Sequence, residues 1–250
     1  MINWTPEAQE KQNKALLDVI KTVKENTSKQ ISTIVIFDLD GTLFDNRTRN
    51  IYILREIAEQ YTHKVPGLAN IVDRFTDLSL IKYSLTETLN NFGITHELEI
   101  DFIRKEWEKR FFADSYQRFD VPLPGSKIYV DQLHQAGATI IYLTGRDIQR
   151  MLVGTTESLR QYGLPVGIIG TMIIQKQDLS ESDETFKVST VEYIKRSGKV
   201  VAVFENEPAN INLLHAHFTE AQYFFVETQH KPDAPDLLVK SHHIIDFRIK

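Results

Sequence analysis

Four short apolar runs constrain the fold of this chain more than any other feature of its sequence. They cover residues 31–37, 138–143, 200–204 and 223–226 and are rich in β-branched and aromatic side chains. Continuous apolar runs of this length are typical of strands that are buried on both faces of a parallel sheet. A polar loop and a stretch with helical periodicity follow each of the first three runs. This alternation predicts an α/β fold, in which right-handed crossovers place helices on both faces of an open parallel sheet.

The segment between the first two runs has a different pattern, with four helical stripes and no convincing strand. The apolar residues at helical spacing are Ile51, Leu54, Ile57, Ala58 and Tyr61, then Leu68, Ile71, Val72 and Phe75, then Leu85 and Leu89, and finally Ile100, Ile103, Trp107 and Phe111. We therefore expect an all-helical cap domain at residues 46–121, inserted after the first strand. Residues 31–45 and 122–250 would form the Rossmann-like core domain.

The first 30 residues are expected to form an N-terminal helical extension. Their apolar residues, among them Leu16, Val19 and Val23, share one face of a helix. Such a face packs on the protein core in most cases, and a dimer contact is the alternative.

Charge and composition restrict the partners of the chain. It has 29 Lys and Arg against 34 Asp and Glu, a net charge of −5, which argues against binding nucleic acid through phosphate contacts. A site for a small anion remains compatible with this balance. The chain has no cysteine, and we see neither a secretory signal nor an apolar run near the roughly 18 residues of a membrane span. We expect a cytoplasmic protein without membrane or nucleic-acid partners, and its oligomeric state is open.

The loop after the first run carries the clearest chemical signal. It reads FDLDGTLFD at residues 37–45. Asp38 and Asp40, at the end of a strand, could act as nucleophile and general acid/base or as metal ligands. Gly41 permits a sharp turn that leaves backbone amides free for an anion. A structural Asx-turn is the alternative, and the preceding strand and following insert make it less favourable.

Three later motifs come at comparable positions. LTGRD follows the second run at residues 143–147, Lys187 lies near the start of a helix, and FENEPAN at 204–210 follows the third run. Because ligands of open parallel sheets bind beyond the carboxyl ends of the strands, these residues are expected to gather at one edge.

In this order the four motifs resemble motifs I to IV of the haloacid dehalogenase (HAD) superfamily, in its phosphatase branch with a helical cap between motifs I and II. The fourth motif is altered, because Glu205 stands where aspartate is usual in the family and Asn210 stands where a second acid often appears. The resemblance spans about residues 31–215 and implies a phosphomonoester hydrolase. Such an enzyme uses Mg²⁺, forms an aspartyl-phosphate and acts on a small phosphorylated metabolite.

The resemblance also implies catalytic roles. Asp38 would attack phosphorus, and Asp40 would protonate the leaving oxygen and then accept a proton from water. Thr144 would donate a hydrogen bond to a phosphoryl oxygen, and Lys187 would neutralise charge at the nucleophile. Lys176 is the nearest alternative to Lys187.

The resemblance implies a metal site and a substrate site as well. Asp38, the backbone carbonyl of Asp40 and Glu205 would hold Mg²⁺, and Glu207 competes with Glu205. For the substrate we expect contacts from Thr144, Gly145 and Arg146.

The sequence does not decide between two roles for each of two charged residues in the motifs. Arg146 either binds the substrate phosphate or pairs with Asp147 or a helix end. Asp45 orients the connection to the insert or caps its Arg-rich start.

Two other functions remain compatible with the sequence besides a hydrolase. A phosphotransferase or mutase would use the same chemistry. A phosphate-binding or partner-binding module with little turnover would account for the altered fourth motif, although retention of Asp38 and Asp40 argues against it.

Overall fold

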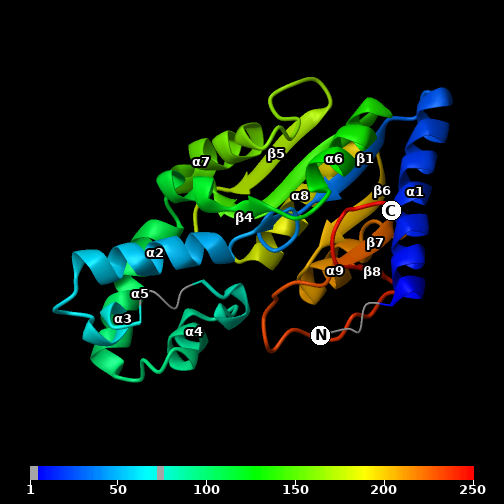
Figure 1. The fold of residues 1–250 in the computed structure, drawn as a ribbon. Coiled ribbons are helices and arrows are strands. Elements are labelled where there is room, and N and C mark those ends of the chain that lie inside the picture. The colour runs from blue at the N-terminus through cyan, green and yellow to red at the C-terminus, as the bar shows by residue number, and fades with distance from the viewer. Residues whose placement is uncertain (1–4, 72–75) are drawn as a thin grey trace. The chain divides into compact units, whose positions relative to one another are not determined.

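The computed structural model describes residues 5–71 and 76–250, which form two compact units (Figure 1). The first unit holds the chain up to Phe44 together with Pro122–Ile148 and Leu159–Lys250, and the second holds Asp45–Val121 and Gln149–Ser158. The sequence pattern predicts residues 149–158 in the core domain, because the helix that contains them follows a core strand directly. In the structure these residues belong to the second unit.

The first unit is built on a parallel sheet of six strands in the order β5-β4-β1-β6-β7-β8. The strands are β1 (Thr33–Phe37), β4 (Ala138–Asp147), β5 (Thr171–Lys176), β6 (Lys199–Glu205), β7 (Gln222–Val226) and β8 (His242–Ile244). Every pairing in the sheet is parallel. The predicted α/β fold is therefore confirmed, and β5 and β8 are additions to the four predicted strands.

Helices cover both faces of this sheet. Val35 and Phe37 of β1 pack in one cluster with residues of α1 (Pro6–Ser28) and α6 (Ser126–Gln135). Ile34 and Ile36 point to the other face, whose cluster includes residues of α8 (Asp183–Ser197) and α9 (Pro208–His215). The alternation of side chains along β1 thus accounts for its unbroken apolar sequence.

Helix α1 belongs to the first unit. Thr5 accepts a hydrogen bond from the Ala8 amide at its start, and Leu16, Val19 and Val23 are fully buried in the first cluster. Packing of this helix on the core, rather than a dimer contact, is therefore confirmed for its apolar face.

The second unit is helical. Its elements are α2 (Arg47–Gln60), α3 (Pro66–Ala69), the 3₁₀ turn η2 (Leu78–Leu80), α4 (Leu85–Asn91), α5 (Glu97–Phe111), the 3₁₀ turn η3 (Asp114–Phe119) and the middle part, Gln149–Ser158, of α7 (Ile148–Gln161). Ile53, Leu54 and Ile103 lie in its own apolar cluster. Val72 and Phe75, expected in the second helical stripe, lie outside the described residues.

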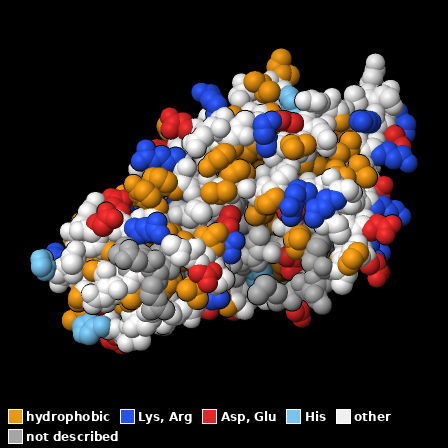
Figure 2. Space-filling model, in the orientation of Figure 1, with side chains coloured by type: hydrophobic (Ala, Val, Ile, Leu, Met, Phe, Trp, Pro, Cys, Tyr) orange, Lys and Arg blue, Asp and Glu red, His pale blue; other side chains and the backbone are white. Residues whose placement is uncertain are grey.

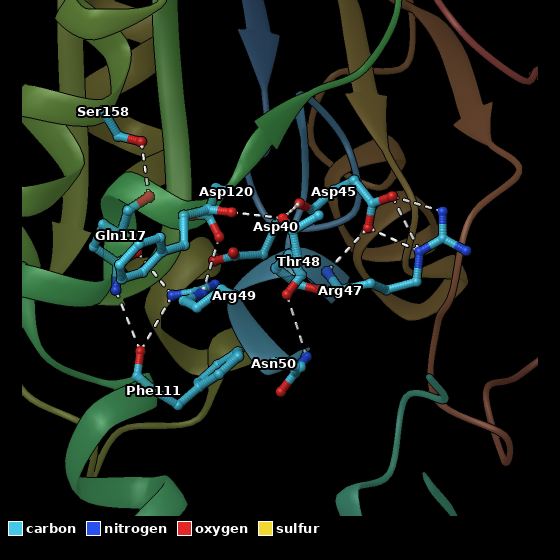
Figure 3. Close-up of polar contacts among 12 residues, drawn as sticks. Asp40, Asp45, Arg47, Thr48, Arg49, Asn50, Phe111, Gln117, Asp120 and Ser158 are labelled. Atoms are coloured by element: carbon cyan, nitrogen blue, oxygen red, sulfur yellow. Dashed lines mark hydrogen bonds and ion pairs between the residues drawn. The ribbon is translucent and has the colours of Figure 1, made fainter. Parts of the chain in front are cut away.

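The start of α2 settles the role of Asp45 in the second unit. Asp45 Oδ1 accepts the Arg47 amide at 3.0 Å, and its Oδ2 accepts Arg47 Nη2 at 2.6 Å (Figure 3). Asp45 therefore caps the Arg-rich start of the insert, one of the two predicted roles. Two-residue strands, β2 (Phe44–Asp45) and β3 (Val121–Pro122), pair where the chain leaves and re-enters the first unit.

The surface in Figure 2 carries acidic and basic side chains side by side, with small apolar groups between them. None of the helices in the described part of the chain is both long enough and apolar enough to cross a membrane.

Candidate active site

The carboxyl ends of three neighbouring strands bring the predicted site residues together. Phe37 of β1 lies opposite Tyr142 of β4 and Phe204 of β6. The residues that follow therefore meet at one edge of the sheet, and the Asp38 amide donates to the Phe204 carbonyl at 3.0 Å. This edge is where open parallel sheets bind their ligands.

Lys187 lies between two acidic residues at this edge. Its Nζ donates to Glu205 Oε2 at 2.5 Å and to Asp38 Oδ1 at 3.3 Å. All three residues are buried, with Lys187 and Glu205 each 1% exposed. Burial raises the pKa of the Asp38 carboxyl well above its usual value, and the Glu205 charge raises it further, although Lys187 opposes both effects. The single ammonium group of Lys187 thus donates to both carboxyl groups.

Burial alone would lower the pKa of Lys187, but the charges of Asp38 and Glu205 outweigh it and raise that pKa above its ordinary value. Lys187 therefore remains an ammonium group. Because α8 begins at Asp183, Lys187 lies on its second turn, with its side chain toward the strand ends.

Glu205 is held by backbone as well as side-chain donors. Its Oε1 accepts the amides of Asn206 and Glu207, both at 3.1 Å, just before α9 begins. Its Oε2 also accepts Asn210 Nδ2 at 3.3 Å. Glu207 instead accepts the Lys231 amide at 3.2 Å. Of the two acids that the sequence left as alternatives, Glu205 is the one beside Lys187 and Asp38.

Lys176, the alternative to Lys187, is engaged elsewhere. Its Nζ donates to Asp183 Oδ1 at 2.7 Å and to the Glu181 carbonyl at 3.2 Å. Sequence order could not separate the two lysines, whereas the direction of their side chains does.

Asp40 and Arg146 form a contact that the sequence did not predict. Arg146 Nε donates to Asp40 Oδ2 at 2.8 Å, and Nη2 donates to Oδ1 at 2.9 Å. The Arg146 side chain is 1% exposed, and that of Asp40 is 29% exposed. This two-point contact fixes the plane of the carboxylate and favours its ionised form. The residues are 106 positions apart, so no local pattern could reveal the pair.

Thr144 and Gly145 lie at the carboxyl end of β4. Thr144 is buried, and its Oγ1 accepts the Arg146 amide at 3.4 Å. A Cβ on Gly145 would lie 2.7 Å from both carboxylate oxygens of Asp183, so the backbone closely approaches the start of α8 there.

The loop with Asp40 is anchored by residues that the sequence analysis missed. Thr42 Oγ1 donates to Asn206 Oδ1 at 3.1 Å, and Thr228 Oγ1 donates to the Gly41 carbonyl. Gly41 has φ +81°, and a Cβ there would clash with the Asn206 amide. A left-handed glycine and a close neighbour explain why this position in the motif requires glycine. The Gly in DGT was the available signal, but it does not identify Asn206.

The arrangement suits displacement at an electron-poor centre. A buried carboxylate lies beside a fixed ammonium, and a second carboxylate is oriented two residues further along the same loop. A nucleophile, charge stabilisation and a proton-transfer group are therefore available at one edge.

Comparison with known proteins gives a family match over residues 35–164, just over half of the chain. The matching family is described as haloacid dehalogenase-like hydrolase. No curated protein sequence matches the chain.

Solved structures share the fold at low sequence identity. A Clostridium difficile protein described as a phosphatase has a TM-score of 0.51 at 15% identity and covers 82% of this chain and 89% of its own. A Burkholderia xenovorans protein described as a haloacid dehalogenase-like hydrolase has a TM-score of 0.51 at 12% identity and covers 87% of this chain and 94% of its own. At these identities the likeness concerns the fold alone.

Proposed function

This chain belongs to the haloacid dehalogenase-like hydrolase family, and from that premise we propose that it is a Mg²⁺-dependent phosphatase acting on a small phosphorylated metabolite. The observation that carries the proposal is the buried group of Asp38, Lys187 and Glu205, with Asp40 oriented close by. Such a centre serves phosphoryl transfer because catalysis there depends mostly on positioning and charge stabilisation.

In the proposed reaction Asp38 attacks phosphorus in line and displaces the alcohol, which forms an aspartyl-phosphate. Asp40 gives its proton to the leaving oxygen and later accepts one from the attacking water. Water then releases inorganic phosphate and regenerates Asp38. Thr144 donates to a phosphoryl oxygen, and Lys187 offsets charge that builds up in the transition state.

Asp40 requires a proton for the first half of this cycle, and Arg146 favours the ionised form. The proposal therefore includes loosening of the Asp40–Arg146 contact when substrate enters. The second half needs the ionised carboxylate, for which the observed contact is suited.

The residues present fit a hard divalent cation by charge. Asp38, Asp40 and Glu205 supply three carboxylates against the two cations Lys187 and Arg146, and burial together with the Glu205 charge raises the pKa of Asp38. Asp38, the carbonyl of Asp40 and Glu205 would hold Mg²⁺, which prefers oxygen ligands. When bound, the ion would offset negative charge on the nucleophile and substrate.

Glu205 already accepts four donors, which equals the number of lone pairs of a carboxylate. As a metal ligand it would have to release one of them. The Asn210 contact, at 3.3 Å, is the longest of the four.

The test measures phosphate release from an aryl phosphate with Mg²⁺ and with chelator, for wild type and Asp38→Asn. Asp131→Asn is the matched control, because Asp131 pairs with Lys127 within α6 and makes none of the contacts described for the site. We expect metal-dependent turnover in wild type and control and none in Asp38→Asn. Turnover that survives Asp38→Asn contradicts the mechanism.

Two further readouts separate the alternatives. Phosphate release equal to substrate loss excludes a phosphotransferase or mutase. If wild type shows no turnover but binds inorganic phosphate in a calorimeter, the binding-module alternative replaces the phosphatase.

A further inference from the structure

Lys187 depends on how the first turns of α8 are held. A lysine side chain carries its ammonium group several ångströms from its own helix, so a small shift of the helix moves Nζ away from its partners. Lys187 Nζ lies 3.3 Å from Asp38 Oδ1, at the outer limit of a hydrogen bond. Little displacement is needed to lose this contact.

Lys176 and Asp183 hold the first turn of α8. Asp183 is the first residue of the helix, four residues before Lys187, so the two side chains lie on the same side of it. Lys176, at the end of β5, donates to Asp183 Oδ1 at 2.7 Å and to the carbonyl of Glu181 just before the helix. The Lys176 side chain is only 6% exposed, so this charge depends on its partners.

Gly145 adds a second constraint at the same place. Its Cα lies so close to Asp183 that a Cβ would approach both carboxylate oxygens to 2.7 Å. The first turn of α8 is thus fixed against the ends of both β4 and β5.

We propose that Lys176 is a positioning residue, which holds Asp183 and thereby keeps the first turns of α8 where Lys187 reaches Asp38. This inference rests on the proposed function, in which Lys187 acts on the transferring phosphoryl group. In this proposal Lys176, which does not lie beside Asp38, acts through Asp183 and α8.

The kinetic test compares Lys176→Met with Lys195→Met. Lys195 pairs with Glu192 near the other end of α8 and is exposed. With an aryl phosphate we expect Lys176→Met to lower kcat about tenfold with KM changed less than about twofold, because a contact made in the transition state is weakened. Lys176→Arg should restore kcat to within about threefold, and Lys195→Met should match wild type.

Non-additivity distinguishes positioning from general destabilisation. In a Lys187→Met background, Lys176→Met should lower kcat no further, because its effect passes through Lys187. A further tenfold loss in that background overturns the proposal, as does a Lys176→Met protein with lower Tm but unchanged kcat.

A structural readout tests the position of Lys187 separately from the proposed function. The crystal structure of Lys176→Met should show Lys187 Nζ beyond hydrogen-bond distance of Asp38, and an unchanged contact overturns the inference. If wild type lacks phosphatase activity, the proposed function fails and this structure alone decides the positioning role. Asp183→Asn, at a half-exposed position, is the second variant if Lys176→Met does not fold.

Discussion

Asp38 and Asp40 are separated by one residue but have opposite surroundings. The buried Asp38 shares Lys187 with Glu205, whereas the partly exposed Asp40 accepts two hydrogen bonds from the guanidinium group of Arg146. Different environments give neighbouring carboxylates different protonation behaviour, and enzymes use this to separate the two roles. Here burial raises the pKa of Asp38, and the Arg146 contact favours the ionised form of Asp40. The proposed cycle therefore requires both surroundings to change when substrate and cation enter.

At the residue scale we expect Arg146→Lys to lower kcat for an aryl phosphate by about 10- to 100-fold, because an ammonium group cannot replace a two-point guanidinium contact. Steady-state kinetics measure this. Arg160→Lys, at an exposed position of α7, is the matched control and should leave kcat unchanged. An Arg146→Lys enzyme with wild-type kcat would show that Asp40 does not need the two-point guanidinium contact.

Some of these residues could be predicted from the sequence, whereas others could not, for physical reasons. Asp38 and Glu205 follow apolar runs directly, so the parallel sheet itself brings them to one edge. The choice between Glu205 and Glu207 depends on the exact end of β6 and start of α9, which a single sequence does not fix. Side-chain pairs such as Asp40 with Arg146 leave no periodic trace at all.

At the element scale, the strands that could be predicted from the sequence are the ones that are buried. Strand β1 is buried at all five positions and β6 at six of seven, and both appear as apolar runs. Strand β5, at the edge of the sheet, has four half-exposed residues, and β8 has three residues, two of them exposed histidines. Edge strands need no continuous apolar sequence, so both escaped prediction.

Helix α1 permits a direct test of packing. We expect Leu16→Ala to lower the free energy of unfolding by about 2–5 kcal/mol, because it leaves a cavity in the first cluster. Leu17→Ala, at the next position but 49% exposed, should change it by less than about 0.5 kcal/mol. Urea unfolding measures both values. Equal effects would mean that the helix does not pack through this face.

At the scale of the whole molecule, each unit carries its own means of stabilisation. The first unit has two apolar clusters around its sheet, together with the buried charges of the candidate active site. The second unit adds buried charge to its apolar cluster: Arg49 pairs with Asp120 at 3.0 Å, both fully buried (Figure 3). Arg49 also donates to Gln117 Oε1 at 2.8 Å. Since removal of one partner leaves a buried charge unpaired, loss of either residue of this pair should destabilise the second unit.

Glu106 of α5 gives the stability of the second unit a defined pH dependence. Hydrogen bonds from Arg110 and Lys109, at 2.7 and 2.6 Å, lower the pKa of Glu106 to about 2 from an ordinary value of 4.5. A carboxyl whose pKa is depressed on folding contributes stability above its unfolded pKa and loses it as the pH falls toward the folded one. We therefore expect Glu106→Gln to be less stable than wild type at pH 7, with the difference shrinking between pH 4.5 and about 2. Urea unfolding across this range measures it, and the exposed Glu108→Gln on the same helix should show a much smaller change. A difference that stays constant down to pH 2 would mean that the ion pairs of Glu106 do not stabilise the folded second unit.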